Sequence, residues 1–182
     1  LTSVDHPQVK YEAGYLGEKL DLTYMVVPIL WKKQLSYAFK CLFKNLPEIC
    51  VSLLKLKVPP IPQLLPYILM TSIILERERL RSEKYDLIYA HWLYPAGFIG
   101  LILSKILKCK VVSAIWGYDI QVIRGVKHYG VQRLKRIIAK IVIERSDLII
   151  TNHKFHKKLA QHVASSTAQD KILYVPSAIP DI

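Results

Sequence analysis

The chain has 182 residues, of which 52% are hydrophobic and 22% are charged, so it can bury a sizeable core and is not a disordered polymer. It carries 26 Lys and Arg against 14 Asp and Glu, and the net charge of +12 favours an anionic partner such as a lipid surface, a nucleic acid or a phosphorylated substrate. Its three cysteines show no CxxC spacing, which argues against a disulfide framework and a structural zinc and favours a reducing, cytosolic setting.

Short apolar runs alternate with helical patterns along the chain. The runs are too short for helices and apolar on both faces, which predicts buried strands at 22–28, 86–91, 110–115, 147–151 and 171–176, after the tail of a first strand at 1–3. Helices are predicted at 8–20, 34–56, 66–83, 96–107, 128–145 and 153–163. This alternation predicts an α/β fold with a doubly wound parallel sheet.

Three further features of the sequence limit the classes of protein. The apolar run 87–107 is interrupted by Pro95, glycines and polar residues, and it divides better into a strand, a turn and a helix than into a membrane span. The four prolines of VPPIPQLLP, 58–66, predict a loop. The motifs of a dinucleotide fingerprint, a P-loop, a hydrolase nucleophile elbow and a zincin are all absent, and no cluster of residues requires a metal.

The positive charge is concentrated in two stretches. Residues 31–57 hold six Lys and one Glu, and residues 123–158 hold ten Lys and Arg and two acidic residues. Both combine apolar residues at helical spacing with basic ones, a pattern that suits docking on an anionic membrane surface or, alternatively, an ordinary amphipathic helix with a solvated basic face. No nucleic-acid-binding motif accompanies the charge, so we expect no nucleic-acid partner.

In open α/β sheets, ligands bind beyond the carboxyl ends of the strands. The segments that follow the predicted strands are 3–6, 28–31, 91–94, 116–119, 152–154 and 177–179.

The string YDLIYAHWLYPAGFIGLILSKILKCKVVSAIWGYD, from Tyr85 to Asp119, resembles the amino-terminal domain of retaining GT-B glycosyltransferases, particularly family 4. Further matching pieces lie at 146–152 and 171–181, so the resemblance covers nearly the whole chain. Trp116 stands where the family usually has a His, and Pro176-Ser177-Ala178 stands where it has P-N-G.

The resemblance implies that 1–182 is one Rossmann-like domain, the acceptor-side half of a GT-B architecture. The start of its first strand is expected to be missing, and the donor domain is expected elsewhere in the full chain or in a separate subunit. The complete enzyme would move a hexose, with retention of configuration, from a UDP- or GDP-sugar co-substrate, without a metal or other cofactor. This half alone is expected to be inactive.

The expected acceptor is a glycan that is lipid-linked or membrane-proximal, because the basic stretches favour peripheral attachment to the inner face of the membrane from the cytoplasm. The alternative is a non-catalytic binding module, which supplies the acceptor half to a separate donor subunit or docks on an anionic surface.

The resemblance also implies an acceptor site beyond two neighbouring strands, with His91 and Asp119 as catalytic residues. The His91 imidazole could hydrogen-bond an acceptor hydroxyl or a donor phosphate, or else be a buried histidine satisfied by the backbone. Asp119 could orient an acceptor hydroxyl or cap the following helix, and Gly117 would permit an unusual backbone. Trp116 could stack on a sugar face.

Other residues are candidates for binding the substrate or the donor phosphates. Further substrate-binding candidates are Gly117, Tyr118, His6 and Asn152, of which Asn152 is also a good helix cap. The loop after the first strand resembles one that approaches donor phosphates, with a plain loop as the alternative. The phosphate-binding candidates are Ser3 and Asp5 in this loop and Gly14 in the helix that follows it.

Overall fold

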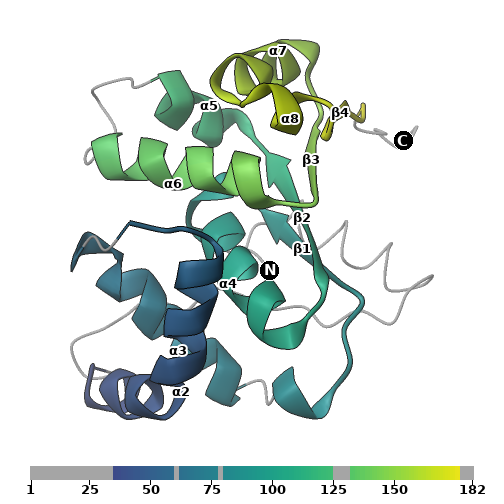
Figure 1. Ribbon diagram of the computed structural model, residues 1–182. Coiled ribbons are helices and arrows are strands. Elements are labelled where there is room, and N and C mark those ends of the chain that lie inside the picture. The colour runs from purple at the N-terminus through teal and green to yellow at the C-terminus, as the bar shows by residue number, and fades with distance from the viewer. Residues whose placement is uncertain (1–34, 60–61, 78–79, 125–131, 177–182) are drawn as a thin grey trace, which may run out of the picture.

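The computed structural model of the chain describes residues 35–59, 62–77, 80–124 and 132–176 (Figure 1). Several predictions lie outside these residues. They are the strands at 1–3 and 22–28, the helix at 8–20, and the site candidates Ser3, Asp5, His6 and Gly14.

The described strands form one parallel sheet with the order β1-β2-β3-β4. Their bounds are β1 Leu87–His91, β2 Lys110–Ile115, β3 Leu148–Thr151 and β4 Ile172–Tyr174. The order of these four strands shows no reversal across the sheet, and all four were predicted within a few residues of their ends. The α/β class with a parallel sheet is confirmed.

Seven helices accompany the sheet in the described part of the chain: α2 Leu35–Lys55, α3 Leu65–Arg77, α4 Phe98–Leu107, α5 Gly117–Arg124, α6 Gln132–Arg145, α7 Lys154–Val163 and α8 Ser166–Gln169. The helix predicted at 66–83 is shorter, because α3 ends at Arg77 and a separate 3₁₀ turn follows at Leu80–Ser82. Pro66 fits the first turn of α3, where its missing N–H has no partner to lose. Sequence periodicity missed α5 and α8.

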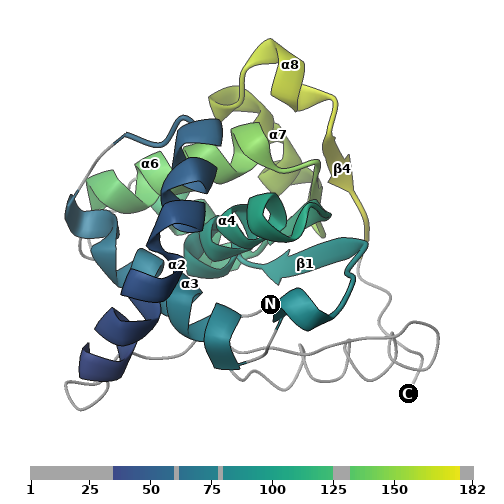
Figure 2. The same cartoon turned by 60° about the horizontal axis from the view of Figure 1, so that its bottom comes forward.

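Helix α4 is the centre of the described core. Its residues from Phe98 to Ser104 are all buried, which is the pattern of a helix covered on every side. One side packs on the sheet, where a Cβ added to Gly100 would lie 3.5 Å from the Cβ of Ala90. The other sides meet α2, α3 and α6, so α2 and α3 form an outer layer beyond α4 (Figure 2). The buried residues of β1 and of α4 explain most of the apolar run 87–107. No helix in the described ranges is long and apolar enough to cross a membrane.

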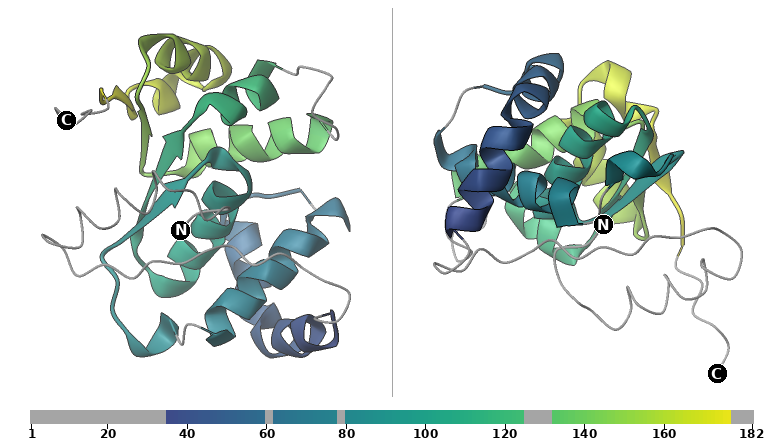
Figure 3. Two further views of the ribbon diagram at one scale, coloured as in Figure 1. Left: turned by 180° about the vertical axis from the view of Figure 1, so that it is seen from behind. Right: turned by 90° about the horizontal axis from the view of Figure 1, so that it is seen from below.

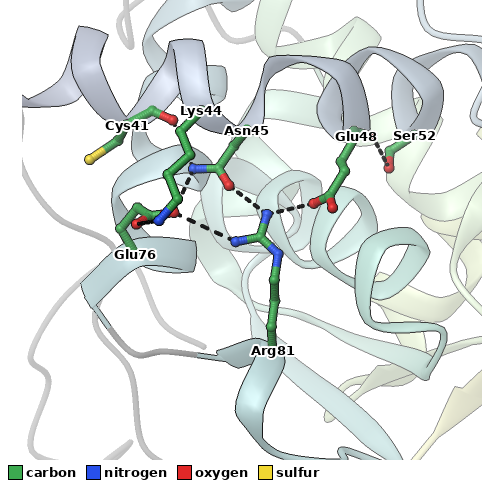
Figure 4. Close-up of polar contacts among 7 residues, drawn as sticks. All are labelled: Cys41, Lys44, Asn45, Glu48, Ser52, Glu76 and Arg81. Atoms are coloured by element: carbon green, nitrogen blue, oxygen red, sulfur yellow. Dashed lines mark hydrogen bonds and ion pairs between the residues drawn. The ribbon is translucent and has the colours of Figure 1, made fainter.

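A part-buried polar network fixes α2 against α3 and the 3₁₀ turn (Figure 4). The side chain of Asn45 is fully buried, and its Nδ2 donates to the carbonyl of Cys41 at 2.7 Å and to Glu76 Oε1 at 3.1 Å. The Arg81 guanidinium donates to Asn45 Oδ1 and to Glu48 Oε2, both at 2.5 Å. These bonds hold one face of α2 toward the protein.

Replacing Asn45 with alanine is expected to lower the free energy of unfolding by about 1–3 kcal/mol, because Arg81 and Glu76 each lose a partner in a part-buried site. The matched control is Lys44→Ala, which removes a 2.7 Å ion pair to Glu76 from a lysine that is 68% exposed. An exposed pair contributes at most about 1 kcal/mol. Urea unfolding measures both variants, and equal losses would contradict the structural role of Asn45.

Candidate functional site

The carboxyl ends of β1, β2 and β3 lie at one edge of the sheet, as the strand register shows. His91, the last residue of β1, pairs with Ala114, and Ile115 pairs with Thr151 of β3. The segments that follow these strands therefore meet at this edge, which is where parallel α/β sheets bind ligands.

His91 and Trp116 come together at this edge as a stacked pair. Their ring centroids are 5.9 Å apart and the ring planes are inclined by 20°. The Tyr89 and His91 rings also pack edge to face, with their centroids 4.8 Å apart. His91 is buried, and this burial lowers its pKa to about 4. The imidazole is therefore neutral near pH 7, with one nitrogen that donates and one that accepts.

Trp116 contributes an indole N–H at the carboxyl ends of the strands, beside His91. Its ring is half-buried with one face against His91, and its Nε1 atom is buried with no hydrogen-bond partner among the described residues. A buried tryptophan N–H ordinarily finds an acceptor. The pair thus presents a donor that a ligand oxygen could satisfy.

Asp119 links the loops that follow β1 and β2. The carboxyl group is fully buried, its Oδ1 accepts the N–H of Leu93 at 3.1 Å, and its Oδ2 accepts the N–H of Trp116 at 3.0 Å. Asp119 is the third residue of α5 and bonds back to the residue that precedes the helix, as the acidic residue of a capping box does. Burial raises the pKa of Asp119 to about 7, and the backbone N–H groups oppose this shift. Asp119 therefore has the predicted role of a helix cap. Its predicted role toward an acceptor hydroxyl stays a prediction.

Gly117 does not have the unusual backbone that the sequence suggested. It begins α5 without a left-handed φ, and a Cβ added to it would meet nothing within 4 Å. The left-handed φ in this region, +69°, belongs to Trp92, directly after β1. A strained non-glycine residue of this kind leaves no mark in the sequence.

A tight loop, Leu93–Gly97, follows β1, and Tyr94 within it has an extended, non-helical backbone. The Gly97 N–H donates to the Trp92 carbonyl at 2.9 Å. A Cβ added to Gly97 would lie 2.8 Å from Val142 Cγ1 of α6 and 3.0 Å from the Trp92 oxygen. Gly97 is therefore required by close packing between this loop and α6.

Helix α6 brings a cation to the site that the sequence did not single out. Lys135 Nζ donates to the Tyr118 hydroxyl at 2.8 Å, and it lies 5.3 Å from the ring centre of Tyr94. The Tyr94 hydroxyl in turn hydrogen-bonds that of Tyr67 on α3, and burial raises the pKa of Tyr94. Lys135 was one basic residue among ten in its stretch, and only the packing of α6 distinguishes it.

Beyond β3 the structure corrects the predicted cap. Asn152 is half-buried, but the residue that caps α7 is His153, whose Nδ1 accepts the N–H of Phe155 at 3.1 Å. The helix begins one residue later than the asparagine signal suggested. The substrate-binding role of Asn152 stays a prediction.

The opposite edge of the sheet carries an open pocket, at the amino ends of β1 and β2. Its polar lining includes Lys84, Asp86, Lys105, Lys110 and Asp147. Asp147 accepts the N–H of Val111 at 2.9 Å and pairs with Lys110 at 3.1 Å. No group of three His, Cys, Asp or Glu side chains in the described ranges could hold a metal ion.

Comparison with known proteins identifies the family. A search of the curated proteins and a search of the solved structures each returned no match. A family model described as glycosyl transferase 4-like matches residues 51–153, which is more than half of the chain. The matched segment runs from within α2 to the cap of α7 and includes β1, β2 and β3 with the loops that hold His91, Trp116 and Asp119. The chain therefore belongs to the glycosyl transferase 4-like family.

Proposed function

We propose that this chain is the acceptor-side domain of a retaining glycosyltransferase that moves a hexose from a UDP- or GDP-sugar to a lipid-linked or membrane-proximal glycan. Family membership supports glycosyl transfer in general. The observation that carries the finer proposal is the stacked pair of neutral His91 and Trp116, with its buried indole N–H, at the carboxyl edge of the sheet.

The pair suits recognition of a sugar. A neutral imidazole can both donate to and accept from hydroxyl groups, and the Trp116 N–H can donate to a hydroxyl or a phosphate oxygen. Asp119 acts as a positioning residue, because its carboxylate holds the backbone of Trp116 and of the loop after β1. Fixed donors of this kind stabilise charge that develops on a departing diphosphate.

The partner domain and the donor-phosphate contacts belong to the proposal as well. In a two-domain enzyme, closure would bring the nucleotide-sugar held by the donor domain to this edge and exclude water. Lys135 lies beside Tyr118 at the same edge and adds a positive charge for an anionic group. We place the protein in the cytoplasm, attached peripherally to the inner membrane face through its basic residues.

Replacing Trp116 with phenylalanine tests the indole N–H separately from the stack. Phenylalanine keeps an aromatic face against His91 but removes the donor, so kcat/KM of the full-length protein for the acceptor is expected to fall roughly 3–10-fold. Trp116→Ala removes both features and is expected to have a larger effect. Lys105→Ala, at the opposite edge of the sheet, is the control.

Measurements of acceptor binding and of nucleotide-sugar consumption separate an enzyme from a non-catalytic binding module. Unchanged kcat/KM in Trp116→Phe would show that the N–H contacts no substrate. A full-length protein that binds the acceptor but consumes no nucleotide-sugar would instead be the non-catalytic binding module.

A further inference from the structure

Helix α2 carries an apolar stripe on the side that faces away from the protein. The stripe is formed by exposed residues at intervals of four, three, four and four: Phe39, Phe43, Leu46, Cys50 and Leu54. These spacings place all five within about a quarter of the helix circumference. Phe43 is 75% exposed and Leu54 is 76% exposed, so the stripe is not part of the core.

The opposite face of α2 is already occupied. Ala38, Leu42 and Ile49 are buried in the core, and Asn45 is held by the network with Glu76 and Arg81 (Figure 4). The helix therefore cannot turn its outer stripe inward without breaking these contacts. It lies at the periphery of the molecule, away from α7 and α8 (Figure 3).

Lysines accompany the stripe along one flank. Lys40 and Lys55 are exposed, and Lys57 follows the end of the helix. Lys44 is exposed as well, but it is paired with Glu76 of α3 at 2.7 Å. The one acidic residue in 35–59, Glu48, is paired with Arg81 at 2.5 Å. This surface therefore combines a continuous apolar stripe with an excess of positive charge, which complements an anionic lipid surface.

The other basic stretch of the sequence has a different structure. On α6, Ile138, Ala139, Val142 and Ile143 are buried against the core, and the basic residues form its solvated face. This is an ordinary amphipathic helix of a globular domain. Two stretches with similar sequence patterns are thus distinguished by which apolar residues remain exposed.

We infer that the outer stripe of α2 binds an anionic lipid bilayer, with α2 lying in the plane of the interface. Phe43 and Leu54 enter the boundary between headgroups and acyl chains, and the flanking lysines contact headgroup phosphates. The inference deepens the proposed function and rests on its membrane-proximal acceptor, for which α2 supplies the membrane contact. A second copy of the chain is the competing occupant of the stripe.

Sedimentation of the full-length protein with vesicles tests this inference. The vesicles contain phosphatidylcholine alone or mixed with phosphatidylglycerol. The wild-type protein is expected to bind the anionic vesicles preferentially. The double variant Lys40→Gln/Lys55→Gln is expected to bind them roughly 30-fold more weakly, since each lysine near an anionic surface contributes about 1 kcal/mol.

A second pair of variants separates the apolar contact from the charge. Phe43→Ser/Leu54→Ser changes only exposed side chains and is expected to reduce binding to anionic vesicles at least about tenfold. The control, Arg136→Gln/Lys140→Gln on the solvated face of α6, removes the same charge as the α2 lysine variant. We expect it to bind more tightly than that variant.

Three results would overturn the inference: equal wild-type binding to neutral and anionic vesicles, unchanged binding of Phe43→Ser/Leu54→Ser, or equal losses in the α2 and α6 charge variants. If that serine variant instead converts a dimer into a monomer, the stripe binds a second copy. Sugar transfer to a water-soluble acceptor, measured on the same variants, is expected to stay unchanged, so failure of lipid binding and failure of the proposed activity are distinguishable.

Discussion

Replacing Asp119 with alanine is expected to lower the free energy of unfolding by about 3 kcal/mol. The change leaves the N–H groups of Leu93 and Trp116 without their acceptor at a fully buried position, and each such loss costs about 1–3 kcal/mol. Denaturant unfolding, followed by tryptophan fluorescence, measures the loss. A change below about 1 kcal/mol would contradict the linking role of this carboxylate.

The pH dependence of stability gives an independent test of the same group. Burial raises the pKa of Asp119 to about 7, so the folded chain retains a proton between about pH 4 and pH 7 that the unfolded chain has released. The contribution of Asp119 to stability is therefore greatest below pH 4, declines as the pH rises toward 7, and is constant above it.

Asp119→Asn is the matched control for this titration, because the amide has the same shape and does not ionise. Between pH 5 and pH 7 the wild-type protein is expected to lose about 2 kcal/mol relative to Asp119→Asn. Parallel stability curves for the two proteins would show that burial does not raise this pKa.

Substitution of Gly97 by alanine is expected to destabilise the protein by about 1–3 kcal/mol, because the new Cβ would lie 2.8 Å from Val142 Cγ1 and 3.0 Å from a backbone oxygen. Gly100→Ala is the matched control on α4. Its Cβ would have ordinary contacts, the shortest 3.4 Å to Ile88 Cγ2, and alanine favours a helix over glycine by up to about 1 kcal/mol. The two substitutions are therefore expected to have opposite signs.

Thermal or urea unfolding of both glycine variants checks this contrast. If Gly97→Ala were as stable as the wild-type protein, the loop after β1 would not lie as close to α6 as the structure places it.

The sheet and its main helices could be predicted because burial on both faces leaves a clear pattern. A short apolar run such as 110–115 has the length of a strand, and the interrupted run 87–107 contains both β1 and α4. Helix α5 was missed because none of the usual capping residues precedes it. Its cap comes instead from Asp119 inside the first turn, and a glycine such as Gly117 in the sequence indicates irregular backbone rather than a helix start.

The candidate site was only partly predictable, because much of it depends on side-chain packing that leaves no pattern in the sequence. The ends of β1 and β2 placed His91 and Trp116 at one edge, but their stacking and the buried indole N–H depend on side-chain packing. The left-handed φ of Trp92 has no sequence signal, and Lys135 resembled its basic neighbours. Likewise, only burial shows that α6 uses its apolar residues in the core whereas α2 exposes its outer stripe.

If this chain supplies the acceptor side of a sugar transfer, the full-length protein is expected to transfer a sugar from a nucleotide-sugar. UDP- and GDP-linked hexoses with a labelled sugar are incubated with the protein and a lipid extract of its source cells. We expect a labelled product that retains the anomeric configuration of the donor and forms more slowly with Trp116→Phe. Absence of any labelled product, with every nucleotide-sugar left intact, would contradict it.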